Sequence, residues 1–408
     1  MKRRVVVTGM GIVSSLGHSI DAALARLKRT QNCVQTSDDL AGYRGLRSRL
    51  WAPCGYVRPP EFTRKVVRTM SPVSELALFA SEQALTAAGL KDDPIIKGGR
   101  LGVAYGSCSG GVEANLDFAS ILANREVRNV TSSTYIKMMP QTCAVNLSVH
   151  YGTTGRILPT GTACTSGSLA IGEAYEQIAY GLQDAMLAGG AEEFSVTQVA
   201  IFDTLFATSV CNDNPELTPR AFDRHRDGLV IGDGAATLVL EEREHALARG
   251  ANVLAEVVGF GTNTDGRHVT QPNAETMAVA LRLALADAAL APEAIGYLNL
   301  HGTATELGDI AEGTATEAVF GRRGVPASTL KSYTGHTLGA CGAIEAALTI
   351  AMMRDGWFAP NLNLNEPDER CGEHDFIRGD GRRIDCEFAM SDNFAFGGVN
   401  TSLVFRRT

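Results

Sequence analysis

Val5-Val-Val-Thr-Gly-Met-Gly11 forms the first apolar stretch of the chain, and Ala255-Glu-Val-Val-Gly-Phe-Gly261 repeats its pattern much later. Both stretches predict a buried β-strand that ends in a Gly-x-Gly turn. Each opens a region in which short apolar runs alternate with Ala- and Leu-rich helical segments, as in layered α/β proteins. We therefore expect two related halves, residues 1–250 and 251–408. No linker separates them, so they should pack as one body.

Composition excludes several classes of protein. The 408 residues are 45% hydrophobic and carry a net charge of −8, which argues against disorder and against general nucleic-acid binding. No apolar run approaches the roughly 18 residues of a membrane span. The basic start could suggest a signal peptide, but Thr8 and two glycines interrupt its apolar part. Nine cysteines without C-x-x-C spacing favour neither disulfides nor a metal site, so we expect a reduced, cytoplasmic protein.

Two glycine-rich stretches resemble functional motifs only in part. Gly9-Met-Gly11-Ile-Val-Ser14 approaches the dinucleotide-binding fingerprint, but its third small position is Ser14 and no convincing strand with an acid follows. A strand-to-loop turn is the simpler interpretation. Gly106-Ser-Cys108-Ser-Gly110 resembles a nucleophile elbow with Cys108 at its centre, but no helix follows at once. We favour a small residue in a glycine-rich turn there.

A stronger nucleophile candidate is Cys164 in Gly161-Thr-Ala-Cys-Thr-Ser-Gly167, which precedes a helical stretch. A thiol at a helix N-terminus feels the positive end of the helix dipole, which should lower its pKa. Small neighbours would let a substrate carbonyl approach and leave backbone N–H groups free to bind an oxyanion. A buried structural cysteine is the alternative.

Three later segments carry further candidates. His301 follows an expected strand and begins His-Gly-Thr-Ala-Thr, although a histidine satisfied in a turn is the alternative. Lys331 and His336 lie in Lys-Ser-Tyr-Thr-Gly-His, where His336 should be a neutral N–H donor at a helix N-terminus and Lys331 could instead be a solvated charge. Asn393-Phe-Ala-Phe396-Gly-Gly-Val-Asn400 predicts a mobile loop that offers a backbone N–H.

Together, Thr-Ala-Cys164-Thr-Ser-Gly, His301-Gly-Thr-Ala-Thr and Lys331-Ser-Tyr-Thr-Gly-His336 resemble the β-ketoacyl-acyl-carrier-protein synthases, the elongating condensing enzymes of the thiolase-like superfamily. The resemblance covers nearly the whole chain. It implies Cys164 as nucleophile, His301 and His336 as catalytic histidines, and Lys331 paired with Glu345. It also implies that the backbone N–H groups of Cys164 and of the gating Phe396 form the oxyanion hole.

The same resemblance implies a thiolase-like five-layer αβαβα fold of two similar halves, with the nucleophile in the first half and the His, His and Lys in the second. It implies a homodimer with acyl pockets at its interface, and no bound cofactor, because the acyl carrier protein supplies phosphopantetheine. Thr303 and Thr305 match positions that contact this arm. We expect Ser109, Phe202 and Phe394 to shape the acyl pocket. An acidic carrier would dock on basic residues: Arg64, Lys65, Arg68, Arg125 and Arg128.

The chain departs from the family pattern at several positions. Glu306 replaces the proline that usually follows His-Gly-Thr-x-Thr, and Cys341 lies in the small-residue helix after His336. Asp392-Asn393 replaces Asn-Ser before the phenylalanine, and Ala395 replaces the glycine between the two phenylalanines. The last two changes leave chain length and substrate class open.

The expected reaction is the decarboxylative Claisen condensation of malonyl-carrier with acyl-carrier in fatty-acid elongation, through an acyl-Cys164 intermediate. One alternative is a ketosynthase of a specialised polyene or polyketide pathway, with a related subunit as a heterodimer. Another is a non-catalytic subunit that shapes the pocket of a partner, although such chains tend to lose the cysteine. A cysteine hydrolase is the third, but two histidines and a lysine exceed what hydrolysis needs.

Overall fold

The computed structural model describes residues 2–128 and 130–408. Their main feature is a continuous sheet in the order β13-β11-β10-β15-β16-β9-β1-β8-β6-β4-β5. The first half supplies β1 (Val5–Ser14), β4 (Leu101–Gly106), β5 (Ile157–Thr160), β6 (Ala185–Glu192) and β8 (Gly234–Glu242). The second half supplies β9 (Ala255–Thr264), β10 (Ile295–Asn299), β11 (Pro326–Ser328), β13 (Asp375–Phe376), β15 (Phe388–Phe394) and β16 (Val399–Arg406).

The strand order repeats between the two halves. The two sets are β5-β4-β6-β8-β1 and β11-β10-β15-β16-β9. In each set, the strand that comes third along the chain (β5 or β11) lies at the outer end. The strand that comes first (β1 or β9) lies at the centre of the sheet. The directions also match, because the outer pairs are parallel and the inner pairs antiparallel. Val5–Val7 of β1 pair antiparallel with Ala255–Val257 of β9 and join the two sets.

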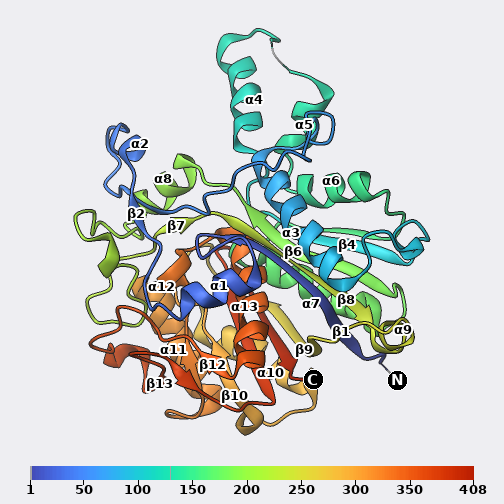
Figure 1. The fold of residues 1–408 in the computed structure, drawn as a ribbon. Helices are drawn as coiled ribbons and strands as arrows, with labels where there is room; N and C mark the ends of the chain where they lie inside the picture. Colours follow the sequence, from blue (N-terminus) through green and yellow to red (C-terminus); the bar gives the residue numbers. More distant parts are fainter. Residues whose placement is uncertain (1, 129) are drawn as a thin grey trace.

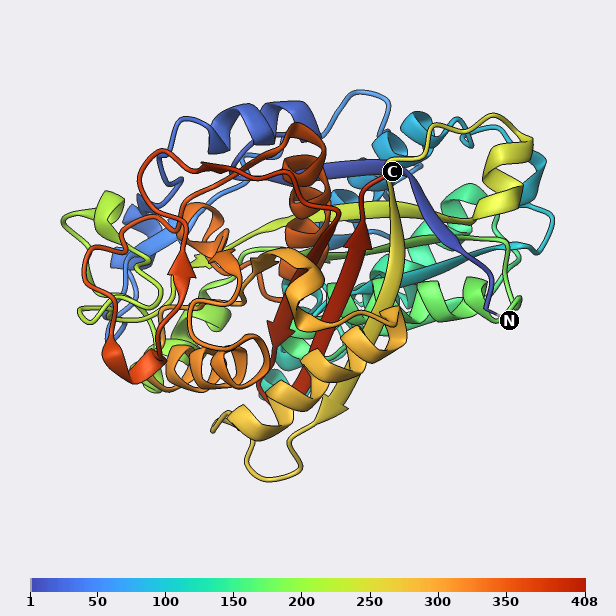
Figure 2. The same ribbon diagram turned by 90° about the horizontal axis from the view of Figure 1, so that it is seen from below.

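Helices separate and cover the two sets of strands, which gives the five layers (Figures 1 and 2). The two central helices pack against each other and against strands of both halves. Outside, one group of helices covers the first set and another covers the second, where Figure 2 shows α10 along β9 and β16. The central helices are α7 (Ser166–Ala179) and α13 (Cys341–Asp355), and the outer ones are α3 (Pro72–Ala88), α6 (Thr142–Tyr151), α10 (Ala274–Ala288) and α11 (Glu306–Phe320).

The Gly-x-Gly pairs lie inside β1 and β9, so the prediction that each strand ends there in a turn is wrong. A Cβ on Gly11 would lie 2.0 Å from the Ala80 carbonyl oxygen of α3, and a Cβ on Gly261 would lie 2.2 Å from the Ala280 carbonyl oxygen of α10. The glycines therefore let a helix lie directly on each strand. Helix and strand meet in the same way in both halves, which explains the repeated pattern.

The central position of α13 follows from its sequence. From Cys341 to Met353 every residue is buried, and Glu345 is the one charged residue in this stretch. A helix that is apolar all round needs cover on every side, and a buried carboxylate needs a partner. Glu345 therefore marks the part of the interior where polar chemistry is concentrated.

Shorter elements complete the described chain. The remaining helices are α1 (Ile20–Leu27), α2 (Asp38–Ala41), α4 (Val112–Asn124), α5 (Ser132–Met138), α8 (Val196–Thr204), α9 (Arg243–Ala248) and α12 (Lys331–Thr334). Three-residue helical turns are η1 (Pro94–Ile96), η2 (Ala163–Thr165), η3 (Pro215–Leu217), η4 (Pro292–Ala294), η5 (Leu338–Ala340) and η6 (Glu369–Cys371). Small sheets contain β2 (Gln35–Thr36), β3 (Leu50–Ala52) and β7 (Ile231–Gly232), and β12 (Trp357–Phe358) with β14 (Arg382–Arg383). No helix in residues 2–128 and 130–408 could cross a membrane.

Candidate active site

Cys164 lies in the turn η2, directly before the central helix α7. The residue before it, Ala163, has a φ of 51°, so the backbone turns sharply into the helix. This turn places the Cys164 sulfur 3.0 Å from Nε2 of His336. His336 comes from the other half of the chain, just before η5. The predicted nucleophile and one predicted histidine are therefore in direct contact.

Both histidines are arranged as neutral N–H donors. The backbone N–H of Leu338 donates to Nδ1 of His336 at 3.3 Å, which leaves the proton on Nε2. Lys331 Nζ donates to Nδ1 of His301 at 3.1 Å, with the same result. Burial and the positive charge of Lys331 hold the pKa of both imidazoles well below the usual value. The prediction that His336 is neutral holds, but burial and the lysine cause it, not the helix dipole alone.

Lys331 and Glu345 form a buried ion pair behind the histidines. Their side chains are 2% exposed, and Nζ lies 2.5 Å from Oε1. Burial lowers the pKa of Lys331, but its ionisable neighbours, with the Glu345 carboxylate in direct contact, raise it by more, so the lysine remains a cation. The interpretation of Lys331 as a solvated charge is therefore wrong. A charge buried this deeply is stable only with a partner.

The pKa of Cys164 was predicted in the wrong direction. Burial raises it to about 11, although Lys331 and the backbone N–H groups of Phe396 and Cys164 act to lower it. Desolvation of the thiolate therefore outweighs the lysine charge and the two N–H groups. The two N–H groups that donate toward the sulfur are the pair that the family resemblance implies for the oxyanion hole.

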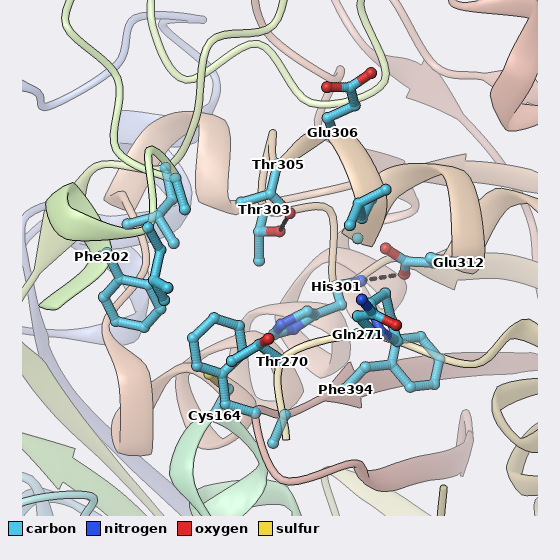
Figure 3. A pocket seen from close by; sticks show the side chains of 18 of the residues that line it. Cys164, Phe202, Thr270, Gln271, His301, Thr303, Thr305, Glu306, Glu312 and Phe394 are labelled. Atoms are coloured by element: carbon cyan, nitrogen blue, oxygen red, sulfur yellow. Dashed lines mark hydrogen bonds between the residues drawn. The ribbon is translucent and has the colours of Figure 1, made fainter. Parts of the chain in front are cut away.

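A cavity of about 510 Å³ opens onto these groups (Figure 3). Along its wall, Glu306 is exposed, Thr305 is half-buried, Thr303 is 9% exposed and Cys164 is 4% exposed. The hydroxyl oxygens of Thr303 and Thr305 lie 2.9 Å apart, which presents two hydrogen-bonding groups between the mouth and the thiol. Glu306 pairs with Arg370 at 2.7 Å beside the mouth.

Two of the three predicted pocket residues line this cavity. Phe202 stacks against Phe396 with ring centroids 5.1 Å apart, and Phe394 lies edge-on to His301 at 6.1 Å. Ser109 does not line the cavity; its backbone N–H donates to Glu192. β15 continues to Phe394, so the predicted loop begins later, at Ala395. Phe396 itself is 38% exposed.

The sulfur and two ring nitrogens of Cys164, His301 and His336 lie within 4.8 Å of one another, close enough to hold a metal ion. Their protonation does not suit one. Each ring accepts a hydrogen bond at Nδ1, so each presents an N–H and not a lone pair at Nε2. This arrangement suits a carbonyl oxygen that gains negative charge.

Three buried side chains near the site have contacts that the sequence did not predict. Glu312 accepts the backbone N–H groups of His301 and Gly302 at 2.6 and 2.7 Å, one of them shown in Figure 3. Glu192 accepts those of Cys108 and Gly339 at 2.8 and 3.1 Å. Burial raises the pKa of both carboxyls to about 8. The third, Asn393, contacts Glu345. Glu312 lies 11 residues after His301 inside α11, and no short motif marks it.

The five predicted docking residues are exposed and lie away from the cavity lining. Arg64, Lys65 and Arg68 precede α3, and within the described chain they form no ion pair. Arg125 ends α4, and Arg128 pairs with Glu126 at 2.5 Å. Both groups are exposed, and their role in docking stays a prediction.

Comparison with known proteins agrees with this geometry. Residues 2–246 match the family model for the beta-ketoacyl synthase N-terminal domain, and residues 254–365 match that for the C-terminal domain. The chain belongs to the beta-ketoacyl synthase family. A 3-oxoacyl-[acyl-carrier-protein] synthase 2 of Vibrio cholerae is 38% identical, over 100% of this chain and 99% of the relative.

Solved structures extend the likeness to the ketosynthase fold. A beta-ketoacyl synthase from Burkholderia phymatum is 56% identical with a TM-score of 0.98, and all of both chains is covered. The ishigamide ketosynthase/chain length factor is 26% identical with a TM-score of 0.91, again over all of both chains. The predicted family, thiolase-like fold class and condensing-enzyme class are confirmed.

Proposed function

We propose that this ketosynthase joins a malonyl unit to an acyl chain, both carried as thioesters on acyl carrier protein, in fatty-acid elongation. The observation that carries the proposal is the meeting of one thiol with two neutral imidazole N–H donors in one cavity. His336 Nε2 lies 3.0 Å from Cys164 Sγ, and the His301 and His336 ring centroids lie 5.2 Å apart. A hydrolase needs a base to activate the water that releases the acyl group, and neither ring is available as a base here.

In the first step, the Cys164 sulfur attacks the acyl thioester carbonyl. The oxyanion that forms is held by the backbone N–H groups of Cys164 and Phe396, and loss of one such donor costs about 3 kcal/mol in this kind of site. The carbon–sulfur bond to phosphopantetheine then breaks. The proton that Cys164 loses leaves with the carrier thiol, and His336 stabilises the sulfur by donation from Nε2.

In the second step, malonyl-carrier occupies the same cavity. Its thioester carbonyl accepts N–H bonds from His301 and His336, and loss of CO₂ leaves the carbon–carbon electron pair as an enolate. The enolate carbon attacks acyl-Cys164, the β-ketoacyl-carrier leaves, and the thiolate takes up a proton. Lys331 keeps both imidazoles neutral and, with Glu345, orients His301. The donors never need to give up a proton.

Phosphopantetheine and the carrier protein that bears it would contact separate surfaces. Phosphopantetheine would pass Thr303 and Thr305, whose hydroxyls lie in the cavity wall. The carrier would meet the exposed basic residues Arg64, Lys65 and Arg68. Arg125 and Arg128 would form a further contact. The nine free cysteines agree with a cytoplasmic, reducing location.

We propose a homodimer, divided in each chain into halves at residues 1–250 and 251–408. The arm formed by α4 and α5 stands out from the rest of the molecule (Figure 1) and leaves Leu116, Leu122 and Val127 at least 70% exposed. Apolar side chains of this kind on one arm indicate an interface. A related subunit could occupy the same surface, since one structural relative is a ketosynthase/chain length factor. That possibility keeps a specialised pathway as the second candidate function.

The test is intact-protein mass after incubation with acyl-carrier thioesters of C4 to C16. A gain of one acyl group, mapped to Cys164, is expected, and its extent ranks the chain lengths. Cys164→Ala should gain none. Acyl transfer to that variant would refute the nucleophile, and no gain with any saturated chain would favour the specialised pathway.

A further inference from the structure

Asn393 lies at the end of β15 with no exposed surface, next to the charged groups of the site. Its side-chain nitrogen lies 2.7 Å from Oε2 of Glu345, 3.3 Å from Nδ1 of His301 and 3.8 Å from the sulfur of Cys341. Asn393 occupies one of the positions at which the chain departs from the family pattern.

The orientation of the amide is fixed by its neighbours. Reversing it would turn the carbonyl oxygen toward the Glu345 carboxylate and toward the Nδ1 lone pair of His301, and both contacts would be repulsive. In the present orientation Oδ1 has no hydrogen-bond partner in the described chain and faces Gly342, where an added Cβ would lie 2.6 Å from it. An unpaired buried carbonyl is unfavourable. The amide is therefore held by its nitrogen and by the space that Gly342 leaves.

We propose that Asn393 is a positioning residue for the malonyl half of the reaction. Glu345 is held at Oε1 by Lys331 and at Oε2 by Asn393, so the carboxylate cannot rotate. Asn393 and Lys331 both direct N–H groups at Nδ1 of His301, which keeps the proton on Nε2, toward the cavity. The inference rests on the proposed function, because it assigns His301 to the malonyl carbonyl.

The geometry predicts that Asn393 acts on one half-reaction only. Cys164 and His336 contact each other, and neither forms a hydrogen bond with Asn393 among the described residues. Acyl transfer to Cys164 should therefore survive its loss. Condensation should not, because a misplaced His301 offers a poorer donor to the enolate oxygen.

The test compares Asn393→Leu, a substitution of similar volume without the donor, with the wild-type chain. Acylation of Cys164 by acyl-carrier is expected to change by less than about twofold, whereas condensation of the pre-acylated enzyme with malonyl-carrier falls at least about tenfold, as loss of a hydrogen bond to a charged group allows. Asn146→Leu is the matched control, because Asn146 is also buried but bonds to Thr69 and Thr142 away from the cavity. It should leave the ratio of the two rates unchanged.

Asn393→Ala keeps the test open if the leucine variant does not fold. It removes the donor to Glu345 and to His301 without adding bulk, so a selective loss of condensation is again expected. Equal loss of both half-reactions, or no loss in either variant, would overturn the inference. A wild-type chain that accepts no acyl group at all would instead contradict the proposed function.

Discussion

The turn before α7 and the turn before α13 have the same backbone shape but different contents. Each begins with a left-handed residue, Ala163 with a φ of 51° and Leu338 with a φ of 46°, and each leads through three helical residues into a central helix. The next residue is Cys164 in the first turn and Gly339 in the second. A Cβ on Gly339 would lie 2.7 Å from the Glu192 carboxylate, so this turn has no room for a side chain. Repetition of the fold supplies two equivalent helix starts, and only one can hold a nucleophile.

The second turn contributes in another way. His336 lies just before it and reaches across to the first turn, and Glu192 fixes the backbone of Gly339 at 3.1 Å. The first half thus supplies the thiol, and the second half supplies the N–H donors and the charge. Similar backbones with unlike side chains make one site between the halves.

The largest expected effect comes from replacing, one at a time, the two thiols beside these turns, Cys164 and Cys341. Cys164→Ala should lower condensation by at least about a thousandfold, because it removes the thiol proposed to take the acyl chain. Cys341→Ala removes a weak S–H donor to the Cys164 carbonyl, and should cost no more than about fivefold. The measurement is product formation from acyl- and malonyl-carrier. Equal losses in the two variants would show that the halves do not divide the chemistry as described.

A smaller effect tests the structural equivalence of the halves. Gly11→Ala and Gly261→Ala each push a Cβ against a helix carbonyl oxygen, at 2.0 and 2.2 Å, and each should destabilise the fold by about 1–3 kcal/mol. Urea unfolding measures this. Gly42→Ala is the control, because Gly42 is exposed and a Cβ there meets only the Asp39 carbonyl oxygen at 3.2 Å. It should change the free energy of unfolding by less than about 0.5 kcal/mol. A clear difference between the first two would weaken the equivalence.

The smallest expected effect is on pH dependence, and it separates the two half-reactions. Because burial and the charge of Lys331 hold the pKa of His301 and of His336 well below 6.5, condensation of pre-acylated enzyme should not fall as the pH is lowered from 7 through 6.5. The pKa of Cys164 is raised to about 11, so acylation should accelerate with pH over the same window. Glu192 and Glu312, with pKa values of about 8, titrate mainly above it. Single-turnover rates measure both steps. A condensation rate that falls below a midpoint near pH 6.5 would contradict neutral donors.

The fold class and most of the reacting groups could be predicted from the sequence, because each has a local pattern. Cys164, His301 and Lys331 all lie in short motifs next to predicted strands or helices, and the structure brings them together. The repeated glycine pattern correctly pointed to two similar sets of strands. It was misinterpreted as a turn because the close approach of a helix leaves the same signature as a tight bend.

The remaining features depend on contacts between distant segments. Glu312 and Glu192 bind backbone N–H groups, and such bonds select no residue type at the partner position. The role proposed for Asn393 depends on neighbours that only the folded chain brings to it. The pKa of Cys164 depends on how completely the thiol is buried, which its helix position does not reveal. Motifs therefore located the chemistry, and burial determined its electrostatics.

The central claim is that an acyl group on Cys164 is consumed by a malonyl-derived enolate held by His301 and His336. The most direct measurement is a single-turnover chase of pre-acylated enzyme with malonyl-carrier, following enzyme mass, released CO₂ and product together. The account predicts one CO₂ and one β-ketoacyl-carrier for each acyl group lost. Release of the acyl group as a free acid, or of CO₂ while the acyl group stays on Cys164, would contradict it.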